Sequence, residues 1–483
     1  MKINLKKLIQ YSLNALKIEN EKNLCFVFTE MLKTSKYLRE RPIRAEGAIT
    51  IRLSFINFII RNLSFKNKSQ MVQTDLLFFA DSKNQLQSFN EIIIKSEGYG
   101  FESTLLTPEK VTFEPKPLDN SNYKQIKIHF SILDIISCLF LMLFRRNIRK
   151  TLIAGHSYKN IIVKKYYNNY LMPYILLPFY VRLLAKIQPK IVMVSNDHNI
   201  STRTLRLAAE VLGIKTAYLQ HAFVATTFPP LNFDYAFLDG HESMKVYAKC
   251  NDNFDEFNSL NCMVLLTGQK KLILTNKPEI DFCVGVACNL LDEYEELEKL
   301  LLVLNKQNIK VVVRPHPRQT KLFVEKLINL SQTMPLLSFS NSLYENQNDF
   351  FYKISLLLAG NSSIHLEANI ANLNSYYVAL GKEPVVDDYY GFIASGLISY
   401  FTLTSDDLTL SALLKMAKNN SVKSKVVKLY SETYDTKWQS NESELVLKTL
   451  NSIIKYNSIP KLYHSIQKFE GFKDIYALSS ADN

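Results

Sequence analysis

Short apolar runs rich in β-branched residues alternate with helical stretches along most of this chain. Strands that alternate with helices predict a parallel sheet wrapped by helices. In the first half the expected strands are residues 75–80, 190–195, 214–219 and 234–238, with a helix at 201–212. After a strand at 262–267 the alternation resumes, with strands at 281–288, 310–314, 354–359 and 375–380 and helices at 291–305, 319–330 and 363–371.

This pattern predicts an α/β protein with two Rossmann-like halves that face each other. The chain divides most naturally near residue 265, which gives an N-terminal domain at 1–265 and a second domain at 266–403. Residues 1–70 have the pattern of amphipathic helices, and the polar region 97–123 is expected to be a long loop. The tail, 404–483, is polar and mainly helical in pattern, and we expect it to pack back on the two domains.

The composition is that of a globular protein. With 47% apolar and 21% charged residues, the 483-residue chain can bury a large core and lacks the charge excess of a disordered protein. Its length fits about two or three domains. Only 13 glycines and 15 prolines are present, which excludes collagen-like and Gly/Pro-rich low-complexity sequences.

The chain is basic, since 58 Lys and Arg residues against 45 Asp and Glu residues give a formal net charge of +13. The basic residues are dispersed and form no RNP-like, zinc-finger or helix-turn-helix pattern, so nucleic acid is not an expected partner. Acidic small molecules such as nucleotide sugars, and anionic glycans, match this charge better.

Two apolar segments, 131–144 and 170–181, leave two interpretations open. The first is followed by a basic stretch at 145–150, and the second is interrupted by two prolines. The first falls short of the ~20 residues needed to span a bilayer. Each taken alone is better explained as a buried helix; the alternative is that a basic, aromatic-rich protein lies against an anionic membrane face.

The cysteines indicate a reducing compartment. Six of them are scattered without a CxxC pair, and several lie in apolar runs: Cys25, Cys138, Cys250, Cys262, Cys283 and Cys288. This is typical of buried thiols, not of a disulfide frame or a zinc site. The basic N-terminus also lacks the apolar region of a secretory signal. The expected location is the cytoplasm, with a peripheral position on the inner face of the plasma membrane as a further possibility.

Parallel α/β sheets bind ligands at the carboxyl ends of their strands, so the residues that follow each strand are the candidates for chemistry. Arg314 ends one apolar run, and His316 follows between Pro315 and Pro317, with Arg318 next. Three potential cations at one strand exit suit the binding of phosphate oxygens. The alternative is a proline-rich turn in which the histidine is incidental.

A second candidate follows the strand at 354–359. Gly360 allows close approach of the backbone, and Asn361, Ser362 and Ser363 come at the start of the next helix, which contains Glu367. These residue types are common in ordinary helix capping. The same residues also offer hydroxyl and amide donors to one anion, and together with the Arg-Pro-His-Pro loop they predict a phosphate site.

The third candidate lies in the N-terminal half. Asp197 and His198 follow one strand, and His221 follows the next. Because the two strands are expected to be neighbours in one sheet, their ends would bring these side chains close together. One of them could then act as a general base that takes a proton from an acceptor hydroxyl. A single histidine at a strand end is often structural. Two histidines at the ends of neighbouring strands are better evidence for a site than either residue alone.

Other chemistries find little support. The sequence has no GxxxxGK[ST], GxSxG, HExxH or GxGxxG motif, and its eight histidines show no metal-ligand spacing with cysteines or carboxylates. No DxD motif stands at a strand end, which argues against a metal-dependent sugar transferase. We therefore expect no metal and no other cofactor.

The combination of two α/β halves, Arg-Pro-His-Pro, Gly-Asn-Ser-Ser and a Gln-His at a strand end resembles GT-B glycosyltransferases of bacterial surface-polysaccharide synthesis. The sequence is most similar to capsule-type enzymes: sialyl- and polysialyltransferases with HP and SS motifs, Kdo transferases, and CDP-glycerol glycerophosphotransferases. The resemblance covers about residues 190–380. It implies a GT-B fold with a cleft between two domains and extra helices at both ends.

The resemblance also implies roles for individual residues. His316, with Arg314 and Pro317 beside it, would contact the phosphate of a cytidine nucleotide, and Ser362 and Ser363 would bind the same phosphate. Glu367 would be placed to meet the ribose or the base. His221 matches the histidine of a QHG motif in which this chain has Ala222. The acidic motif that supplies the base in sialyltransferases is not evident, and Asp197 could replace it.

The activity that follows is metal-independent, inverting transfer of a sugar, such as a nonulosonic acid or Kdo, from a CMP-sugar to a bacterial surface glycan or lipid-linked glycan. Cations and helix ends would stabilise the departing nucleotide. Asp197 or His221 would act as the base. Two alternatives stay open: a CDP-glycerol-type glycerophosphotransferase, and a non-catalytic nucleotide- or glycan-binding subunit of a polysaccharide assembly complex.

Overall fold

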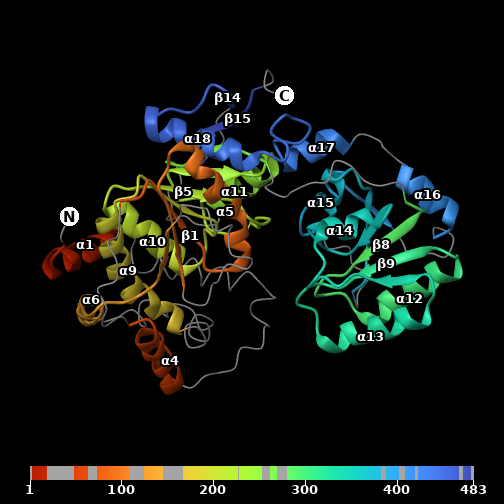
Figure 1. The fold of residues 1–483 in the computed structure, drawn as a ribbon, viewed down its shortest axis with the longest axis horizontal. Helices are drawn as coiled ribbons and strands as arrows, with labels where there is room; N and C mark the ends of the chain where they lie inside the picture. The colour runs from red at the N-terminus through yellow and green to blue at the C-terminus, as the bar shows by residue number, and fades with distance from the viewer. Residues whose placement is uncertain are drawn as a thin grey trace. The chain divides into compact units, whose positions relative to one another are not determined.

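The computed structural model describes residues 3–18, 48–63, 73–108, 124–144, 167–226, 228–252, 261–268, 280–381, 388–401, 408–418, 423–466 and 471–479. The chain forms two compact units (Figure 1). The first consists of Met1–Thr267 and Asn441–Asn483, and the second of Gly268–Ser440. The second unit is thus inserted between two pieces of the first.

The first unit contains a nine-stranded sheet. Its strands are β1 Leu76–Phe79, β2 Ser103–Thr107, β3 Lys124–Lys127, β4 Ile191–Val194, β5 Lys215–Leu219, β6 Tyr235–Leu238, β7 Met263–Leu266, β14 Tyr463–Ile466 and β15 Asp474–Leu478. They lie in the order β14-β15-β7-β6-β5-β4-β1-β2-β3. All neighbours are parallel except the antiparallel pair β14 and β15. Strands β1, β4 and β6 are buried throughout, as their apolar sequences require when helices cover both faces.

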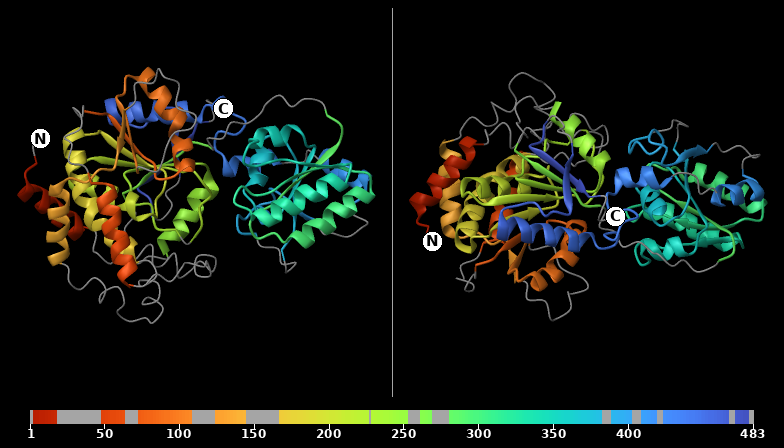
Figure 2. Two further views of the ribbon diagram at one scale, coloured as in Figure 1. Left: turned by 60° about the horizontal axis from the view of Figure 1, so that its bottom comes forward. Right: turned by 90° about the horizontal axis from the view of Figure 1, so that it is seen from above.

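Helices cover both faces of this sheet. They are α1 Leu5–Ile18, α4 Ala48–Arg61, α5 Lys83–Ser96, α6 Ile132–Phe144, α9 Tyr167–Ile187, α10 Ile200–Val211, α11 His241–Asp252 and α18 Glu442–Tyr456, with a 3-10 turn η1 at Glu97–Tyr99. Helices α9 and α10 pack together, and α1, α4 and α6 pack on α9 (Figure 2). Helices α5 and α18 pack on each other.

Strand β1 shows how the two faces are built. Successive residues of a strand point to opposite faces. The ring of Phe78 lies 5.2 Å from that of Phe89 in α5, whereas the ring of Phe79 lies 6.2 Å from that of Tyr180 in α9. Helix α9 is therefore a core helix on the face opposite to α5.

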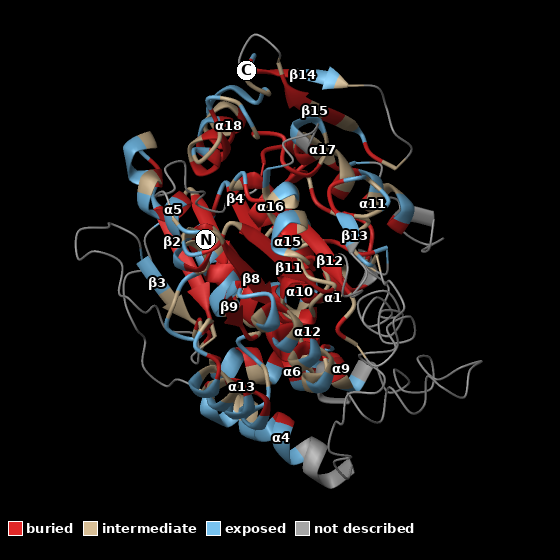
Figure 3. Ribbon diagram, turned by 90° about the vertical axis from the view of Figure 1, so that its right-hand side faces the viewer, coloured by how far each residue is buried: buried red, intermediate tan, exposed pale blue. Residues whose placement is uncertain are grey.

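The second unit contains a six-stranded, fully parallel sheet. Its strands are β8 Cys283–Ala287, β9 Lys310–Arg314, β10 Leu337–Phe339, β11 Leu356–Ala359, β12 Ser375–Val378 and β13 Ser399–Phe401. Its helices are α12 Tyr294–Lys306, α13 Lys321–Thr333, α14 Gln347–Tyr352, α15 Ile364–Ile370, α16 Leu410–Lys418 and α17 Lys423–Tyr430. One core packs α12, α13 and α16 on the sheet, and the other packs α14 and α15 on it. The central strands of both sheets are coloured as buried in Figure 3.

Both sheets have a point where the direction of winding reverses. The order β10-β9-β8-β11-β12-β13 is the doubly wound order 3-2-1-4-5-6, and β3-β2-β1-β4-β5-β6 repeats it in the first unit. In such sheets, ligands bind beyond the carboxyl ends of the two strands at the reversal. The expected ligand sites are therefore at the carboxyl ends of β8 and β11 in the second unit, and of β1 and β4 in the first.

The α/β class and two parallel-sheet units are confirmed, and each strand expected from the sequence is present, with each of its ends within two residues of the expected position. The expected loop at 97–123 was wrong at β2, and residues 109–123 lie outside the described part. The chain divides after residue 267, two residues beyond the expected boundary. The tail does not form a third unit: it divides at 440, and its last part adds β14 and β15 to the first sheet. A cleft between facing domains stays a prediction.

Candidate functional site

The reversal point of the second sheet brings together the loops that follow β8, β9 and β11. Asn289, two residues beyond β8, connects them. Its side-chain amide donates to the carbonyl of Asn361 (3.2 Å), and its own carbonyl accepts from the side chain of Gln319 (3.3 Å). Asn361 follows β11, and Gln319 follows β9. Asn289 therefore links the loops that follow three strands of the sheet. It was not among the site residues expected from the sequence.

Asp292 fixes the backbone of the loop that contains Asn289. Its carboxylate accepts from the backbone N–H of Asn289 at 2.7 Å, and the residue is 8% exposed. Burial raises the pKa of the Asp292 carboxyl to about 7. A Cβ on Gly360 would lie 2.9 Å from the Asp292 Oδ1 and 3.1 Å from the Asn289 Nδ2, so the glycine is required for close packing. The sequence predicted that the backbone of Gly360 is closely approached by another group. In the structure, the groups that approach it are Asn289 and Asp292.

The Arg-Pro-His-Pro loop presents a histidine of defined tautomer. The Nδ1 atom of His316 accepts a hydrogen bond from the backbone N–H of Arg318 at 3.0 Å. A backbone N–H can only donate, so Nδ1 carries no proton and the neutral ring carries its proton on Nε2. Burial, and then the charge of Arg318, lower the pKa of His316 below its ordinary value. His316 is thus a neutral N–H donor at pH 7, while Pro317 beside it is exposed.

Arg314 differs from the expectation of a phosphate ligand. Its guanidinium donates to the Ser340 hydroxyl at 2.7 Å and to the Glu345 carbonyl at 2.8 Å, and it lies over the Phe350 ring at 5.5 Å. Arg314 therefore ties β9 to the segments that follow β10. Instead of three cations, the strand exit offers one neutral donor, His316, and one exposed cation, Arg318.

The Gly-Asn-Ser-Ser segment lies at the start of α15. Ser362 and Ser363 are half-buried, and Ser363 caps the helix without a side-chain hydrogen bond to its backbone. Because α15 has only seven residues, its dipole is weak, and the serine hydroxyls are the stronger candidates for binding an anion here. The buried His365 holds the segment through a 3.0 Å contact between its Nε2 atom and the Gly360 carbonyl. The Glu367 carboxylate is buried and accepts from Gln347 of α14.

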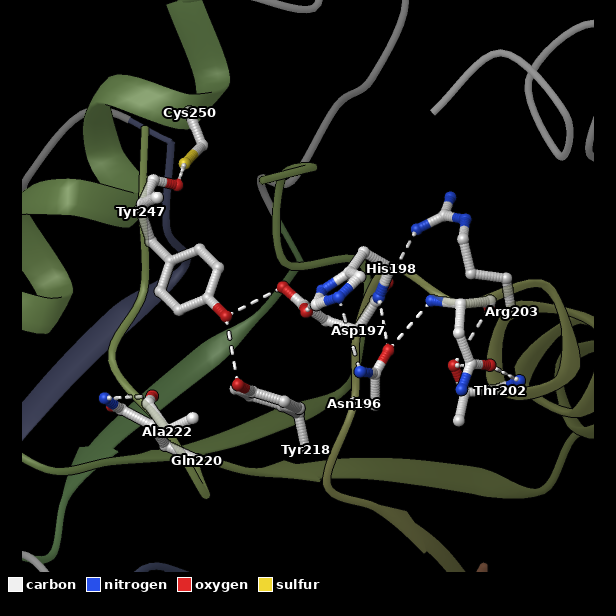
Figure 4. Close-up of polar contacts among 12 residues, drawn as sticks. Asn196, Asp197, His198, Thr202, Arg203, Tyr218, Gln220, Ala222, Tyr247 and Cys250 are labelled. Carbon is white, nitrogen blue, oxygen red and sulfur yellow. Dashed lines mark hydrogen bonds and ion pairs between the residues drawn. The ribbon is translucent and has the colours of Figure 1, made fainter. Parts of the chain in front are cut away.

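The first unit places a histidine and a buried carboxylate after β4 (Figure 4). The Nδ1 atom of His198 lies 2.8 Å from Oδ1 of Asp197, and the hydroxyl of Tyr247 in α11 donates to Oδ2 of Asp197 at 2.7 Å. Asp197 is 1% exposed, whereas 24% of the His198 side chain is accessible. With its proton on Nδ1, His198 has a lone pair on Nε2, as a base requires, and this atom accepts a long, 3.4 Å hydrogen bond from the side-chain amide of Asn196. Asp197 orients this histidine and is too enclosed to reach an acceptor.

The loop that carries His198 is fixed by its own side chains. The carbonyl oxygen of the Asn196 side chain accepts from the backbone N–H groups of His198 (3.0 Å) and Asn199 (2.8 Å). Asn199 caps α10 and also donates to the carboxylate of Asp81, which follows β1. Burial raises the pKa of Asp81. The two strands at the reversal of the first sheet therefore both contribute to this site, and Asp81 was missed because β1 lies more than a hundred residues upstream.

His221 is half-buried in the loop after β5. The preceding Gln220 is structural: its side chain donates to the Ala222 carbonyl (3.1 Å) and the Ser243 hydroxyl (2.9 Å) and accepts from the Asp239 backbone (3.0 Å). The expected contact is observed between Asp197 and His198, and the position of His221 beside them stays a prediction.

Within the described ranges, no group of three or more His, Cys, Asp or Glu side chains could hold a metal ion. Among the same residues, one helix is long and apolar enough to cross a membrane; it is Tyr170–Ile187 within α9, and 83% of it is buried inside the protein. The expectation of a buried helix is confirmed for this segment. The basic stretch at 145–150 lies outside the described residues.

No protein-family model and no curated protein matches this chain, but several solved structures do. A protein of Listeria monocytogenes described as a UDP-N-acetylglucosamine 2-epimerase has a TM-score of 0.52 and 11% sequence identity, over 80% of this chain and 99% of that one. The chain has the GT-B fold. At this identity the likeness shows the fold alone.

Two further solved structures match with TM-scores just below 0.5. The UDP-GlcNAc 2-epimerase of Neisseria meningitidis bound to UDP-GlcNAc matches with a TM-score of 0.48 and 12% identity, over 78% of this chain and 99% of that chain. The calicheamicin glycosyltransferase matches with a TM-score of 0.49 and 13% identity, over 80% of this chain and 100% of that chain.

Proposed function

We propose that this GT-B protein is a metal-independent, inverting glycosyltransferase that uses a CMP-sugar, with a nonulosonic acid or Kdo as the sugar and a bacterial surface glycan as the acceptor. The observation that carries the proposal is the convergence of three strand exits on Asn289 at the reversal point of the second sheet. Ligands of doubly wound sheets bind at this place. The cytidine and the sugar class come from the resemblance of the Arg-Pro-His-Pro and Gly-Asn-Ser-Ser segments to the capsule-type enzymes.

The donor phosphate would be held by neutral donors and one cation. His316 offers its Nε2–H, Ser362 and Ser363 offer hydroxyls, and Arg318 supplies the positive charge. When the bond between the anomeric carbon and the phosphate oxygen breaks, the nucleotide leaves with the bonding electrons. Donors already in position stabilise that growing negative charge.

The acceptor hydroxyl would lose its proton to His198. The acceptor oxygen forms the new bond to the anomeric carbon, and its proton moves to the Nε2 atom of His198. Asp197 then stabilises the imidazolium from the other side of the ring through its 2.8 Å contact. One direct displacement inverts the anomeric centre.

Calorimetric titration of the full chain with CMP, CDP, UMP, UDP and GDP, without added metal, tests the donor. We expect CMP to bind most tightly and His316→Ala to weaken it by about tenfold or more, because a hydrogen bond to a charged group is lost. His464→Ala, an exposed histidine of β14, is the matched control and should bind CMP as the wild type does. A preference for UDP, or unchanged affinity in His316→Ala, would contradict the proposal.

The same titration separates the alternatives. A preference for CDP, with phosphodiester linkages in the product, would indicate a glycerophosphotransferase. CMP binding without turnover on any acceptor would indicate a non-catalytic subunit. Conversion of UDP-GlcNAc would indicate an activity like that named for the Listeria protein.

A further inference from the structure

Helix α6 is oriented with its apolar side outward. Its exposed positions follow a helical repeat and are all large and apolar: Ile132, Leu133, Ile136, Leu139, Phe140 and Leu143. Leu139 is 57% exposed and Leu143 is 63% exposed. The buried side of the same helix carries Asp134 and Ser137, which are both 0% exposed. This stripe is roughly 17 Å long at the rise of an α-helix.

The polar side of α6 is buried because it has a partner there. Asp134 accepts two hydrogen bonds from Arg182 of α9, at 2.8 Å and 2.7 Å. This bidentate ion pair fixes the rotation of α6 about its axis. The outward orientation of the apolar stripe is therefore set by the fold. For the segment at 131–144, the expectation of a buried helix was wrong on this face.

Helix α4 extends the apolar surface. Leu53, Ile56 and Ile60 are 57%, 49% and 60% exposed. The end of α4 meets the start of α6, where Leu63 and Phe130 form a β-bridge and the Phe130 N–H donates to the Asn62 carbonyl at 2.6 Å. Both helices pack on α9 and lie on the same side of the first unit (Figures 1 and 2). Nine of the exposed large apolar side chains of the described residues belong to these two helices.

The exposed charges of the described residues of helices α1, α4 and α6 have one sign. Helices α1, α4 and α6 contain a single acidic residue, Asp134, which is buried and paired. Lys6 and Lys7 of α1 and Arg61 of α4 are exposed. An apolar stripe flanked by lysine and arginine is the composition of helices that lie in the interface of an anionic membrane.

We propose that the exposed face of α4 and α6 docks on the surface of a membrane that contains anionic lipid, with the apolar side chains in the acyl boundary and the basic residues of α1 and α4 at the headgroups. A second copy of the chain is a poorer occupant. A two-fold contact through this face would bring identical positive groups together with no exposed carboxylate on the three helices to pair with them. This proposal does not depend on the sugar-transfer activity.

Co-sedimentation of the full chain with lipid vesicles tests the docking. We expect binding to phosphatidylcholine vesicles that contain about 30% phosphatidylglycerol, weaker binding to pure phosphatidylcholine, and loss of the difference at about 0.5 M NaCl. Leu139→Glu/Leu143→Glu should weaken binding to the anionic vesicles at least tenfold, because two charges enter the contact face. Leu322→Glu/Leu343→Glu, at positions of the second unit that are 65% and 67% exposed, is the matched control and should bind like the wild type.

Three outcomes would overturn the proposal: no binding of the wild type to anionic vesicles, equal loss in the two double variants, or a wild-type dimer that the α6 variant alone dissociates without any vesicle binding. The last result would assign the face to a second copy. Nucleotide titration of Leu139→Glu/Leu143→Glu, whose changes lie in the first unit, separates a failure of docking from a failure of the proposed activity.

Discussion

Replacing Asp292 by asparagine should stabilise the second unit, and only at high pH. The carboxyl is buried beneath the Asn289 loop, and burial raises its pKa from 3.8 to about 7. In the unfolded chain the group titrates near its ordinary value. Between about pH 4 and about pH 7 the folded state therefore keeps a proton that the unfolded state has lost, so stability falls as pH rises through this window and is constant above it.

The size of the effect follows from the shift. About three pH units correspond to about 4 kcal/mol of unfolding free energy once both states are ionised. Asparagine keeps an acceptor for the Asn289 N–H and has no charge to bury. The free energy of unfolding of Asp292→Asn minus that of the wild type should therefore grow by about 3 kcal/mol between about pH 5 and about pH 8.

Urea unfolding followed by tryptophan fluorescence measures this, because the only tryptophan of the chain, Trp438, is buried in the second unit. Asp281→Asn is the control: Asp281 is exposed, and Lys310 lowers its pKa, so it stays ionised across the whole range. A difference between Asp292→Asn and wild type that is the same at both ends of the pH range would refute the reasoning.

Two further predictions concern binding and turnover. Gly360→Ala should weaken CMP binding about tenfold, because the new Cβ would press on the Asp292 carboxylate 2.9 Å away; Gly98→Ala, where an added Cβ meets nothing within 4 Å, should leave affinity unchanged in the same calorimetric titration. His198→Gln should lower kcat by about 10²–10⁴ with CMP affinity kept, whereas His221→Gln should change kcat little. A larger loss in His221→Gln, measured as product release from a CMP-sugar, would make His221 the base.

The central strands could be predicted because they are long apolar runs. Strands β8, β9 and β11 are buried on both faces, so their sequences contain little besides Val, Leu and Ala. The strands missed lie toward the edges of the two sheets. Strand β3, Lys-Gln-Ile-Lys, is polar and largely exposed, and β10 has three residues. Such strands are recognisable only from the neighbour that they pair with.

At the site, the sequence identified which loops matter but not which atoms face the ligand. His316, Ser362 and Ser363 follow strands as predicted, yet Arg314 is directed to Ser340 because that hydroxyl lies on the neighbouring strand's exit. The direction of a side chain depends on residues far along the chain. Tyr247 was missed for the same reason, since it reaches Asp197 from a helix fifty residues away. Asn289 and Asp292 had a local signal, polar residues directly after a buried strand.

The discontinuous first unit has a consequence for synthesis. Strand β7 pairs with β15 on one side, and about 200 residues separate the two strands in the chain. At a translation rate of about 5–20 residues per second, the edge of β7 stays open for about 10–40 s after it leaves the ribosome. An open parallel edge is a template for pairing with other chains. During that interval the inserted unit is made whole, and the emergence of β15 then covers the edge of β7 and ends its exposure to aggregation.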